Sequence, residues 1–534
     1  MNRNNSSKSA EGIVYLVGAG PGDVGLFTLR GMELLQQADV VVYDALVGSE
    51  IVALIPDGAE RVYVGKRNHH HTKEQDEISR LLVEKAREGK RCVRLKGGDP
   101  YLFGRGGEEA QVLKCNGIPF ETVSGVTSAF AVPASVGIPV THREYASSVH
   151  IITAHRVAVV NSKEQPGSLS EIRAGLSDGN REMLYEDEAI DYKALLRAGG
   201  TYVFLMGLTA LPNIVQGFLQ VGMRSDIPVA VISNGTMAAV KKTVATLATI
   251  EKEAAGMQAP AIIVVGDVCA LSDELDTRSA KRLSGKRVII CSSERKKGTI
   301  AQPLRENGAE VIEKTMITVQ ANQDRAQLQE AIEEMGKYQW LVFTSPEGVT
   351  IFFDEWRRMR RDIRELGTVR IAAIGEKTAA EIENKCLKVD LTPAVHDGGA
   401  FGKELAKVIE PGEHVLIPRA VQGGASLIDE ISQVKDVIIT DLPIYETVQR
   451  SATDEALRVL VGDDVETMLV FTSASSVKGF LAVTEDMDYN HCRCACIGNQ
   501  TKRAAQKLNI PCYVSEEARM ESLLDLVLKP ETWN

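Results

Sequence analysis

The chain has 534 residues, 44% of them hydrophobic and 25% charged, and a formal net charge of -11 at pH 7. A chain of this length exceeds a single hydrophobic core and predicts about three or four domains. The excess of acidic residues argues against nucleic acid as a partner. No apolar run approaches the roughly 18 residues of a membrane span, so no membrane partner is expected.

The start of the chain and its cysteines indicate a cytoplasmic protein. Residues 1–11 lack the apolar core of a signal peptide and are expected to form a disordered tail. The nine cysteines are scattered along the sequence. This distribution is typical of reduced thiols rather than of a disulfide framework.

Residues 12–143 alternate apolar, strand-like runs with amphipathic helices. This alternation predicts a mostly parallel α/β sheet that binds ligands at the carboxyl ends of its strands. A helix is expected at residues 78–88, and strands are expected at residues 13–17, 40–43, 61–64 and 91–95.

Two of the predicted strands end in glycine-rich loops. Residues 18–23 read GAGPGD after the first strand, and residues 97–100 read GGDP after the fourth. Glycines remove the Cβ atoms from a strand end, so a ligand can contact the backbone there. A pair of ordinary tight turns is the alternative structural interpretation.

The first loop also partly matches the dinucleotide fingerprint G-x-G-x-x-G. Pro21 and Gly22 directly follow the second glycine, and Gly25 comes one residue late for the third. Asp39 and Asp44 are candidates for the acidic residue that would bind a ribose. A nicotinamide-dependent oxidoreductase therefore stays open as the less favoured alternative.

A second α/β subdomain is predicted over residues 145–270. Residues 161–189 are polar without clean periodicity and are expected to form a surface excursion. Residues 271–285 are polar and charged, which is typical of a linker. Strands of this subdomain are expected at residues 149–153, 201–206, 229–232, 244–246 and 261–265.

An internal repeat follows the linker. Three apolar segments, at residues 286–290, 341–345 and 371–375, return at nearly the same interval as residues 414–417, 469–473 and 494–498. The repeat predicts two similar α/β units with a cleft between them.

Cys492, Cys494 and Cys496 alternate in sequence beside His491. Metal-binding cysteines usually occur in pairs such as C-x-x-C. Alternation instead sends all three side chains to one face of a strand. The pattern favours a buried strand over a metal site, and no metal is expected.

Five sequence blocks in the amino-terminal half occur in an order that resembles a known family. They read GIVYLVGAGPGDVGLFTLRG, VVYDALV, VGKR, VRLKGGDPYLFGRGGEEA and GIPVTHR. Together they resemble the tetrapyrrole methylases, specifically uroporphyrinogen-III C-methyltransferases, over about residues 12–270. The resemblance implies S-adenosylmethionine as the cofactor, S-adenosylhomocysteine as its product, and a homodimer formed through this half.

The same resemblance implies site residues. Asp44 and Lys66 match the family's proposed proton-handling pair. Taken singly, Met206 could be plain core, and Thr127 with Ser128 could cap a helix. The residues that match the cofactor motifs GxGPGD, GGDP, GVTS, MGL and NGT are Pro21, Gly97, Gly98, Asp99, Leu102, Thr127, Ser128, Met206 and Gly235.

Residues 283–534 resemble uroporphyrinogen-III synthase more weakly. The resemblance implies a bilobal α/β fold with flavodoxin-like lobes and a chain that crosses between them twice. One lobe is expected at residues 283–317 plus 443–534, and the other at residues 318–442.

Candidate residues of this half lie at a crossover and at strand ends. Tyr445 matches the family's candidate tyrosine, which would assist hydroxide departure; a half-buried tyrosine at a crossover is the alternative. Thr344-Ser345 and Thr472-Ser473 end strands on opposite lobes. Their hydroxyls and following amides are expected to face the cleft and to suit carboxylates.

The two resemblances together imply a bifunctional enzyme with small-molecule tetrapyrrole substrates. One half would cyclise hydroxymethylbilane to uroporphyrinogen III, and the other would methylate that product twice to precorrin-2, toward sirohaem or cobalamin. Because the substrate is polyanionic and the chain is acidic, basic residues must concentrate in the clefts. The alternative is a methylase of a later corrin intermediate with a carboxyl-terminal half that only binds tetrapyrrole.

Overall fold

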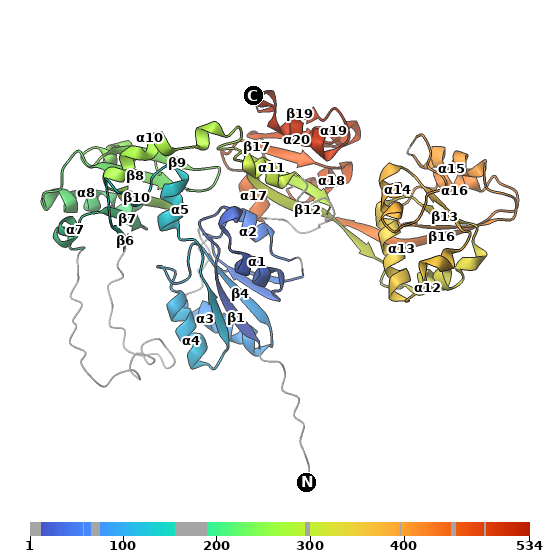
Figure 1. The fold of residues 1–534 in the computed structure, drawn as a ribbon, viewed down its shortest axis with the longest axis horizontal. Coiled ribbons are helices and arrows are strands. Elements are labelled where there is room, and N and C mark those ends of the chain that lie inside the picture. The colour runs from blue at the N-terminus through green and yellow to red at the C-terminus, as the bar shows by residue number, and fades with distance from the viewer. Residues whose placement is uncertain are drawn as a thin grey trace, which may run out of the picture.

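The computed structural model describes residues 12–56, 58–65, 75–154, 190–293, 300–395, 397–449, 455–484 and 487–533. Figure 1 shows an amino-terminal half, coloured blue to green, and a carboxyl-terminal half, coloured yellow to red, each made of two α/β units. The predicted tail and the predicted excursion at residues 161–189 lie outside the described residues. Within the described ranges, no helix is long and apolar enough to cross a membrane.

The first unit is a parallel five-stranded sheet in the order β3-β2-β4-β1-β5. Val41 and Val93 pack into the core on one face, and Val40 and Cys92 pack into the core on the other. Burial on both faces explains why these strands are continuous apolar runs. The elements are β1 (Ile13–Gly18), α1 (Leu29–Gln36), β2 (Val40–Tyr43), α2 (Ser49–Ala53), β3 (Glu60–Tyr63), α3 (Gln75–Arg87), β4 (Arg91–Lys96), α4 (Gly106–Cys115) and β5 (Phe120–Val123).

The second unit is a mixed five-stranded sheet in the order β6-β7-β10-β8-β9, in which β6 and β7 pair in parallel. One face packs against Ala129 and Val132 of α5, and the other packs against Ile214 and Phe218 of α8. The elements are α5 (Ser128–Ser135), β6 (Val149–Thr153), α7 (Tyr192–Ala198), β7 (Thr201–Leu205), α8 (Leu211–Gln220), β8 (Pro228–Ser233), β9 (Lys241–Thr246), α9 (Ile250–Glu253) and β10 (Ala261–Val265).

The carboxyl-terminal half is built on one nine-stranded sheet in the order β14-β13-β15-β16-β12-β11-β17-β18-β19. The order β14-β13-β15-β16 is repeated by β18-β17-β11-β12, and the two copies meet where β16 pairs antiparallel with β12. The predicted duplication is therefore confirmed. The strands are β11 (Arg287–Ser293), β12 (Glu310–Ala321), β13 (Trp340–Phe343), β14 (Arg370–Ala373), β15 (His414–Ala420), β16 (Ile438–Gln449), β17 (Thr467–Phe471), β18 (Cys492–Cys496) and β19 (Cys512–Val514).

Helices cover both copies of the repeat. The unit around β17 carries α11 (Ala301–Glu306), α17 (Glu455–Val461), α18 (Ala474–Val483), α19 (Asn499–Ala505) and α20 (Met520–Leu528). The unit around β13 carries α12 (Ala326–Glu333), α13 (Pro346–Arg358), α14 (Glu376–Glu383), α15 (Gly398–Ala406) and α16 (Ser426–Ile431).

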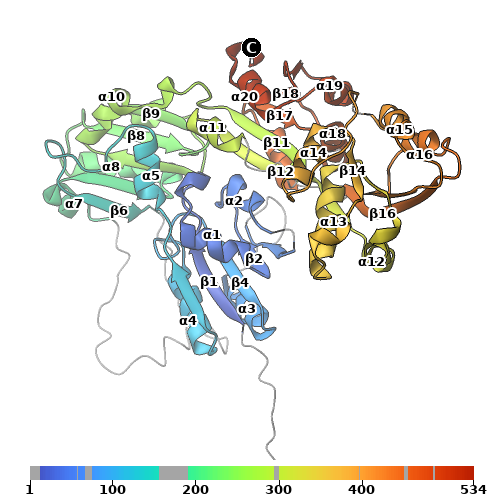
Figure 2. The ribbon, with the colours of Figure 1, turned by 45° about the vertical axis from the view of Figure 1, so that its right-hand side comes forward.

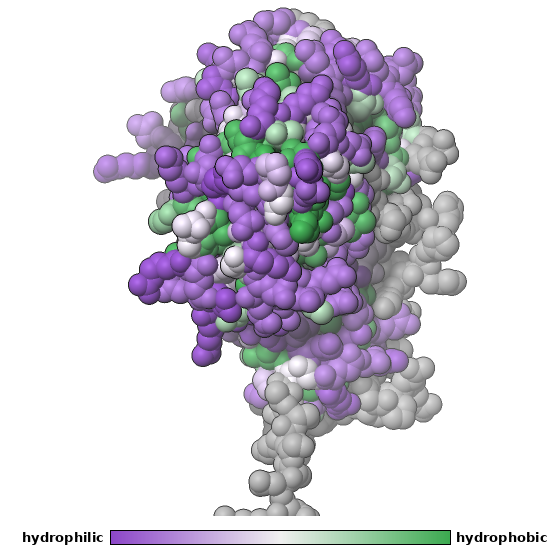
Figure 3. Space-filling view, turned by 90° about the vertical axis from the view of Figure 1, so that its right-hand side faces the viewer, coloured by the Kyte–Doolittle hydropathy of each residue, from purple (hydrophilic) through white to green (hydrophobic). Residues whose placement is uncertain are grey.

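The unit around β13 stands apart from the rest of the molecule in Figure 1, and Figure 2 brings it toward the viewer. The long strands β12 and β16 lead into it, and each has 12 residues. Figure 3 looks onto this side of the molecule and shows a mainly hydrophilic surface with apolar side chains in small separate groups. The apolar side chains that hold this unit together, such as Phe343, Phe352 and Trp356, lie in its own core.

The residues predicted to form a linker are folded. They include α10 (Ser272–Leu275), and the ammonium of Lys242 lies 3.2 Å from the carboxylate of Asp276. Hydrogen bonds from Arg278 are the main cause that lowers the pKa of Asp276. Leu283 is buried in a core of the carboxyl-terminal half. The connection is therefore fixed at both of its ends.

A buried carboxylate, Glu50 of α2, joins the two halves. Its Oε1 accepts hydrogen bonds from the amide of Val311 at 2.9 Å and from Arg305 at 3.2 Å. Its Oε2 accepts from the amide of Val24, next to the first glycine loop, at 3.4 Å. Burial raises the pKa of Glu50 to about 7, against the lowering effect of Arg305.

A second carboxylate at this junction, Glu310, contacts both units of the amino-terminal half. Its Oε1 accepts from the hydroxyl of Ser49 at 3.3 Å, and its Oε2 accepts from the amide of Ala238 at 3.2 Å. Arg287 donates to the same Oε2 at 3.3 Å. The carboxyl-terminal half therefore packs where the first two units meet.

Candidate active sites

Three strand ends of the first unit meet backbone to backbone at one edge of the sheet. A Cβ on Gly125 would lie 2.2 Å from the carbonyl oxygen of Gly98, and a Cβ on Gly18 would lie 2.4 Å from the amide nitrogen of Gly125. Approaches this short exclude any side chain, so glycine is required here. We call Gly18, Gly98 and Gly125, with the loops that carry them, the glycine rim.

Hydrogen bonds tie the loops of the glycine rim together. Gly20 and Gly98 exchange two main-chain hydrogen bonds of 3.1 and 2.7 Å. Both residues have positive φ, which glycine adopts without strain. The carboxylate of Asp99 accepts from the amide of Gly125 at 3.1 Å. The structure thus places the predicted Gly97, Gly98 and Asp99 together, with the Asp99 side chain engaged by the protein backbone.

The second unit also contains unusual backbone conformations. Met206 follows β7 with a φ of 55° and is 49% exposed, so the alternative that places it in the core is wrong. Asn234 and Thr236, on either side of Gly235, have φ values of 49° and 70°. Such conformations cluster at functional sites. The hydroxyl of Thr236 donates to the carbonyl of Pro21 at 3.2 Å, which brings the two units into contact.

The remaining predicted cofactor residues lie where the first two units meet, and we call this contact the seam. Leu102 packs against a core of the second unit. A Cβ on Gly98 would lie 3.8 Å from the amide nitrogen of Ser128, the first residue of α5. Thr127 is the N-cap of that helix, and its hydroxyl accepts from the amide of Ala129 at 3.3 Å. The interpretation of Thr127 as a helix cap is therefore correct. Thr127 also lies at the seam between the two units.

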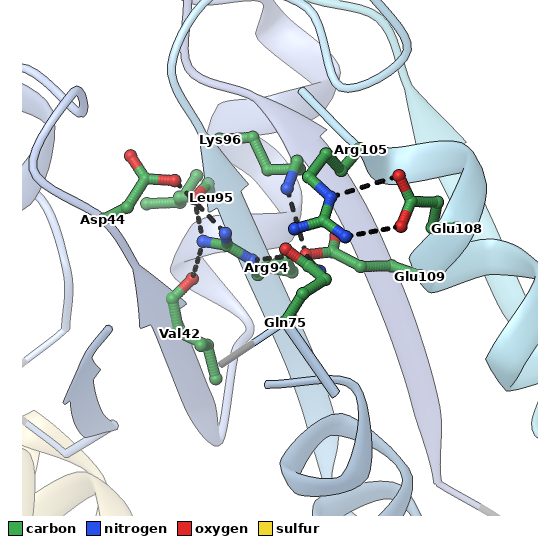
Figure 4. Close-up of polar contacts among 9 residues, drawn as sticks. All are labelled: Val42, Asp44, Gln75, Arg94, Leu95, Lys96, Arg105, Glu108 and Glu109. Carbon is green, nitrogen blue, oxygen red and sulfur yellow. Dashed lines mark hydrogen bonds and ion pairs between the residues drawn. The ribbon is translucent and has the colours of Figure 1, made fainter. Parts of the chain in front are cut away.

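An ion pair positions the carboxylate of Asp44, which follows β2 (Figure 4). One oxygen lies 3.2 Å from a guanidinium nitrogen of Arg94, and the other accepts from the amide of Leu46 at 3.1 Å. The Arg94 side chain is 3% exposed and the Asp44 side chain 25% exposed. The buried Arg94 therefore fixes the Asp44 carboxylate, which remains partly exposed to solvent. Lys66, its predicted partner, lies outside the described residues.

A buried charge cluster behind Asp44 was not predicted (Figure 4). One oxygen of the fully buried Glu109 accepts from Lys96 at 3.0 Å, from Arg94 at 3.3 Å and from Gln75 at 2.9 Å. Burial, followed by the charge of Arg94, lowers the pKa of Lys96. The available signal was the alternation of Arg94 and Lys96 with apolar residues in a strand that is buried on both faces.

A cavity of about 1350 Å³ lies between the two halves and reaches Asp44. Its volume exceeds the roughly 300–1,000 Å³ of most small-ligand sites, so it has room for a large ligand. The glycine rim and Met206 are not part of its wall. Charged residues of both signs line it, among them Arg61 and Lys241 of the amino-terminal half and Arg287, Lys314, Asp463 and Glu466 of the carboxyl-terminal half.

Tyr445 lies where β16 changes partner strands. Its register partners are Ala420 of β15 on one side and Ala321 of β12 on the other. The residue is 4% exposed, and its hydroxyl lies 2.6 Å from the hydroxyl of Ser345. The structure therefore brings two of the predicted residues of this half together at a crossover.

Equivalent serines begin equivalent helices in the two copies of the repeat. Ser345 is the N-cap of α13 and accepts from the amide of Gly348 at 3.0 Å. Ser473 is the N-cap of α18 and accepts from the amide of Ser476 at 3.1 Å. Both serine oxygens thus have an internal partner, in addition to any contact with a ligand that their position allows.

Known families match both halves of the chain. Residues 13–251 match the tetrapyrrole (corrin/porphyrin) methylases, and residues 298–525 match uroporphyrinogen-III synthase HemD. Among solved structures, a uroporphyrin-III C-methyl transferase from Thermus thermophilus, complexed with S-adenosyl homocysteine, is 35% identical. That match covers 48% of this chain and 98% of the other, with a TM-score of 0.38.

Curated relatives extend the match. A siroheme synthase of Edwardsiella ictaluri is 43% identical over 265 residues, and this chain spans 51% of its length. An S-adenosyl-L-methionine-dependent uroporphyrinogen III methyltransferase of Methanosarcina barkeri is 47% identical over 266 residues, which are 49% of this chain and 94% of the relative. The porphyrin biosynthesis protein HemD of Ruminiclostridium josui is 38% identical over 520 residues, which are 97% of this chain and 98% of the relative. The chain belongs to this family of porphyrin biosynthesis proteins, in which a tetrapyrrole methylase region precedes a uroporphyrinogen-III synthase region.

Proposed function

We propose that the chain catalyses two consecutive steps of tetrapyrrole biosynthesis. The carboxyl-terminal half closes hydroxymethylbilane to uroporphyrinogen III, and the amino-terminal half methylates that product at two pyrrole carbons to give precorrin-2. The observation that carries this proposal is the end-to-end match to one relative, together with the methylase and synthase matches in the two halves of this chain. Residues 12–270 are assigned to the methylase, residues 271–285 to the connection and residues 283–534 to the synthase.

The glycine rim fits S-adenosylmethionine, which supplies a methyl group on a positively charged sulfur. A Cβ on Gly18 or Gly125 would clash with neighbouring backbone, and Gly98 is a partly exposed glycine with a φ of 67°. Exposed backbone amides and carbonyls suit the polar groups of such a cofactor. The residues assigned to holding it are Pro21, Gly97, Gly98, Asp99, Leu102, Thr127, Ser128, Met206 and Gly235.

Asp44 is the group assigned to accept the proton that leaves the substrate carbon after methyl transfer. A general base must reach its proton directly or through one water. Asp44 lines the cavity between the halves, while Arg94 fixes the orientation of its carboxylate. Lys66 is assigned as the second member of the pair on the family resemblance alone.

Tyr445 is assigned to donating a proton to the hydroxide that leaves hydroxymethylbilane. Its hydroxyl shares a hydrogen bond of 2.6 Å with Ser345, and this bond orients it at the crossover between the lobes. A cytoplasmic homodimer formed through the methylase half completes the proposal, with tetrapyrroles as its substrates.

The experiment is to incubate the full chain with hydroxymethylbilane and S-adenosylmethionine and to analyse the product by mass spectrometry. We expect a cyclised tetrapyrrole carrying two added methyl groups. Cyclised but unmethylated material would overturn the methylase assignment, and methylation of linear material only would overturn the synthase assignment. Supplying precorrin-2 as the acceptor tests the later-corrin alternative, which predicts a third methyl group.

The role of Asp44 is tested with Asp44→Ala. We expect the turnover number to fall at least ~100-fold, the contribution typical of a general base, with unchanged affinity for the cofactor. Glu33→Ala, at an exposed carboxylate of α1, is the matched control and should retain parental turnover. Equal loss of turnover and cofactor affinity in Asp44→Ala would reassign the residue to binding.

A further inference from the structure

Three cysteines from two neighbouring strands bring their sulfur atoms together at the far edge of the nine-stranded sheet. Cys494 and Cys496 belong to β18, and Cys512 begins β19 as the register partner of Cys494. The sulfur atoms of Cys494 and Cys496 are 3.7 Å apart, those of Cys496 and Cys512 are 3.7 Å apart, and those of Cys494 and Cys512 are 2.7 Å apart. All three can therefore point at one common centre.

The cluster lies apart from the residues assigned to chemistry. Three strands, β12, β11 and β17, separate β18 from the β16 crossover that carries Tyr445. Cys492 is buried in the same core but is not one of the three clustered residues. The buried strand predicted from the alternating cysteines is thus confirmed. Cys512, from the next strand, adds a third sulfur to those of Cys494 and Cys496.

The surroundings suit a desolvated, anionic sulfur site. Cys494 and Cys496 are fully buried, and Cys512 is partly buried against the same core. The ammonium of Lys502, on α19, supplies a positive charge that interacts electrostatically with Cys496 and Cys512.

We infer that Cys494, Cys496 and Cys512 form a binding site for one soft, thiophilic metal ion, and that Cu(I) is the ion that fits best. At the metal–sulfur bond length of about 2.3 Å that is typical of zinc, two sulfurs 3.7 Å apart can reach one ion. The 2.7 Å separation of Cys494 and Cys512 must widen when the ion binds. Soft thiolate ligands select Cu(I), zinc or iron–sulfur clusters among common metals. The site is independent of the two activities proposed above.

The number of ligands favours Cu(I) over zinc. Structural zinc sites in proteins are almost always four-coordinate. Among the described residues, no histidine, aspartate or glutamate joins the three sulfurs in the cluster. His491, the residue beside the cysteine run, is 54% exposed and lies 3.6 Å from Asp464 instead. Binding one Cu(I) as three thiolates releases the protons that remain on the sulfurs and involves no change of oxidation state.

The test is a titration of the reduced full chain with Cu(I) in competition with a chromogenic Cu(I) chelator. We expect one Cu(I) per chain and protection of Cys512 from alkylation, read by mass spectrometry. Cys512→Ser should weaken Cu(I) binding by more than the roughly 10–100-fold that loss of an outer-sphere contact costs. Cys115→Ser, at an exposed cysteine elsewhere, is the matched control and should bind Cu(I) as the parent does.

A second variant guards against misfolding, because Cys494 is buried. Cys494→Ser should lose Cu(I) binding while keeping the parental ring-closing activity, which reports an intact fold. Zn(II) retention without Cu(I) binding would overturn the choice of ion. Absence of both metals from the reduced chain, or Cu(I) binding that is equally strong in Cys512→Ser, would overturn the site.

Discussion

The glycine rim of the amino-terminal half is built from main chain, whereas the Tyr445 crossover of the carboxyl-terminal half depends on a side chain. The rim depends on missing side chains, since a Cβ on Gly125 would lie 2.2 Å from the backbone of Gly98. The crossover depends on one side chain, Tyr445, which is buried and hydrogen-bonded to Ser345. The rim therefore restricts the choice of residue at several positions, whereas the crossover restricts it at few.

This difference determines how each site should respond to mutation. A Cβ on Gly18 or Gly125 has no space at the rim, and the buried charges of Arg94, Lys96 and Glu109 lie in the same unit. A site made of a hydroxyl pair can lose one oxygen and keep its packing. Substitutions in the amino-terminal half should therefore cost more than substitutions at the crossover, and the following experiments test that order.

The largest effect is expected at the buried charge cluster. Glu109→Gln leaves Arg94 and Lys96 without their buried counter-charge, and breaking such a pair typically costs about 3–5 kcal/mol. The measurement is chemical unfolding of the full chain, followed together with ring-closing activity. Glu108→Gln, which removes an exposed partner of Arg105, should cost no more than about 1 kcal/mol. Equal costs in the two variants would contradict the role assigned to the cluster.

The next effect concerns pH and the junction between the halves. The pKa of Glu50 is about 7 in the folded chain, above its ordinary value of 4.5. Between pH 4.5 and about pH 7, Glu50 is therefore protonated in the folded state and ionised in the unfolded state. The free energy of unfolding falls as the pH rises through this range. The loss is up to about 3 kcal/mol and is complete above pH 7.

Glu50→Gln carries no ionisable group and should remove this part of the pH dependence. The measurement is the unfolding midpoint at pH 5 and pH 8 for the parent and the variant. The parent should lose more stability than Glu50→Gln over this interval. An identical pH dependence in both proteins would show that burial at the junction does not perturb Glu50.

A smaller effect is expected at the glycine rim. Gly125→Ala places a methyl group against the backbone of Gly98, and overpacking costs about 1–3 kcal/mol. If that cost falls on the cofactor-binding conformation, affinity for S-adenosylhomocysteine should drop about 10–100-fold by calorimetry. Gly107→Ala, where nothing lies within 4 Å of the added Cβ, should bind as the parent does. Unchanged affinity in Gly125→Ala would separate the rim from cofactor binding.

The smallest effect on stability is expected at the crossover. Tyr445→Phe removes the hydrogen bond to Ser345 and should cost about 1 kcal/mol of stability. Ring closure should slow by more than Ser345→Ala slows it, because only Tyr445 is assigned a proton to donate. Equal rates in these two variants would reduce Tyr445 to a structural residue.

The fold was largely predictable because strand periodicity and the repeat are properties of local sequence. The glycine loops were predictable for the same reason, since a missing Cβ is visible in the sequence. The cluster of Glu109, Arg94 and Lys96 was not, because it depends on α3 and α4 closing over one face of β4. Cys512 was missed for an equivalent reason, since only the pairing of β18 with β19 brings it to Cys494.

The most direct test of the central claim is a structure of the full chain with bound S-adenosylhomocysteine. The account predicts that the nucleoside lies on the seam between the first two units, against the backbone of Gly97 and Gly98 and beside the exposed Met206. Density for the nucleoside at any other place, or a seam that closes without admitting it, would contradict the assignment of the amino-terminal half.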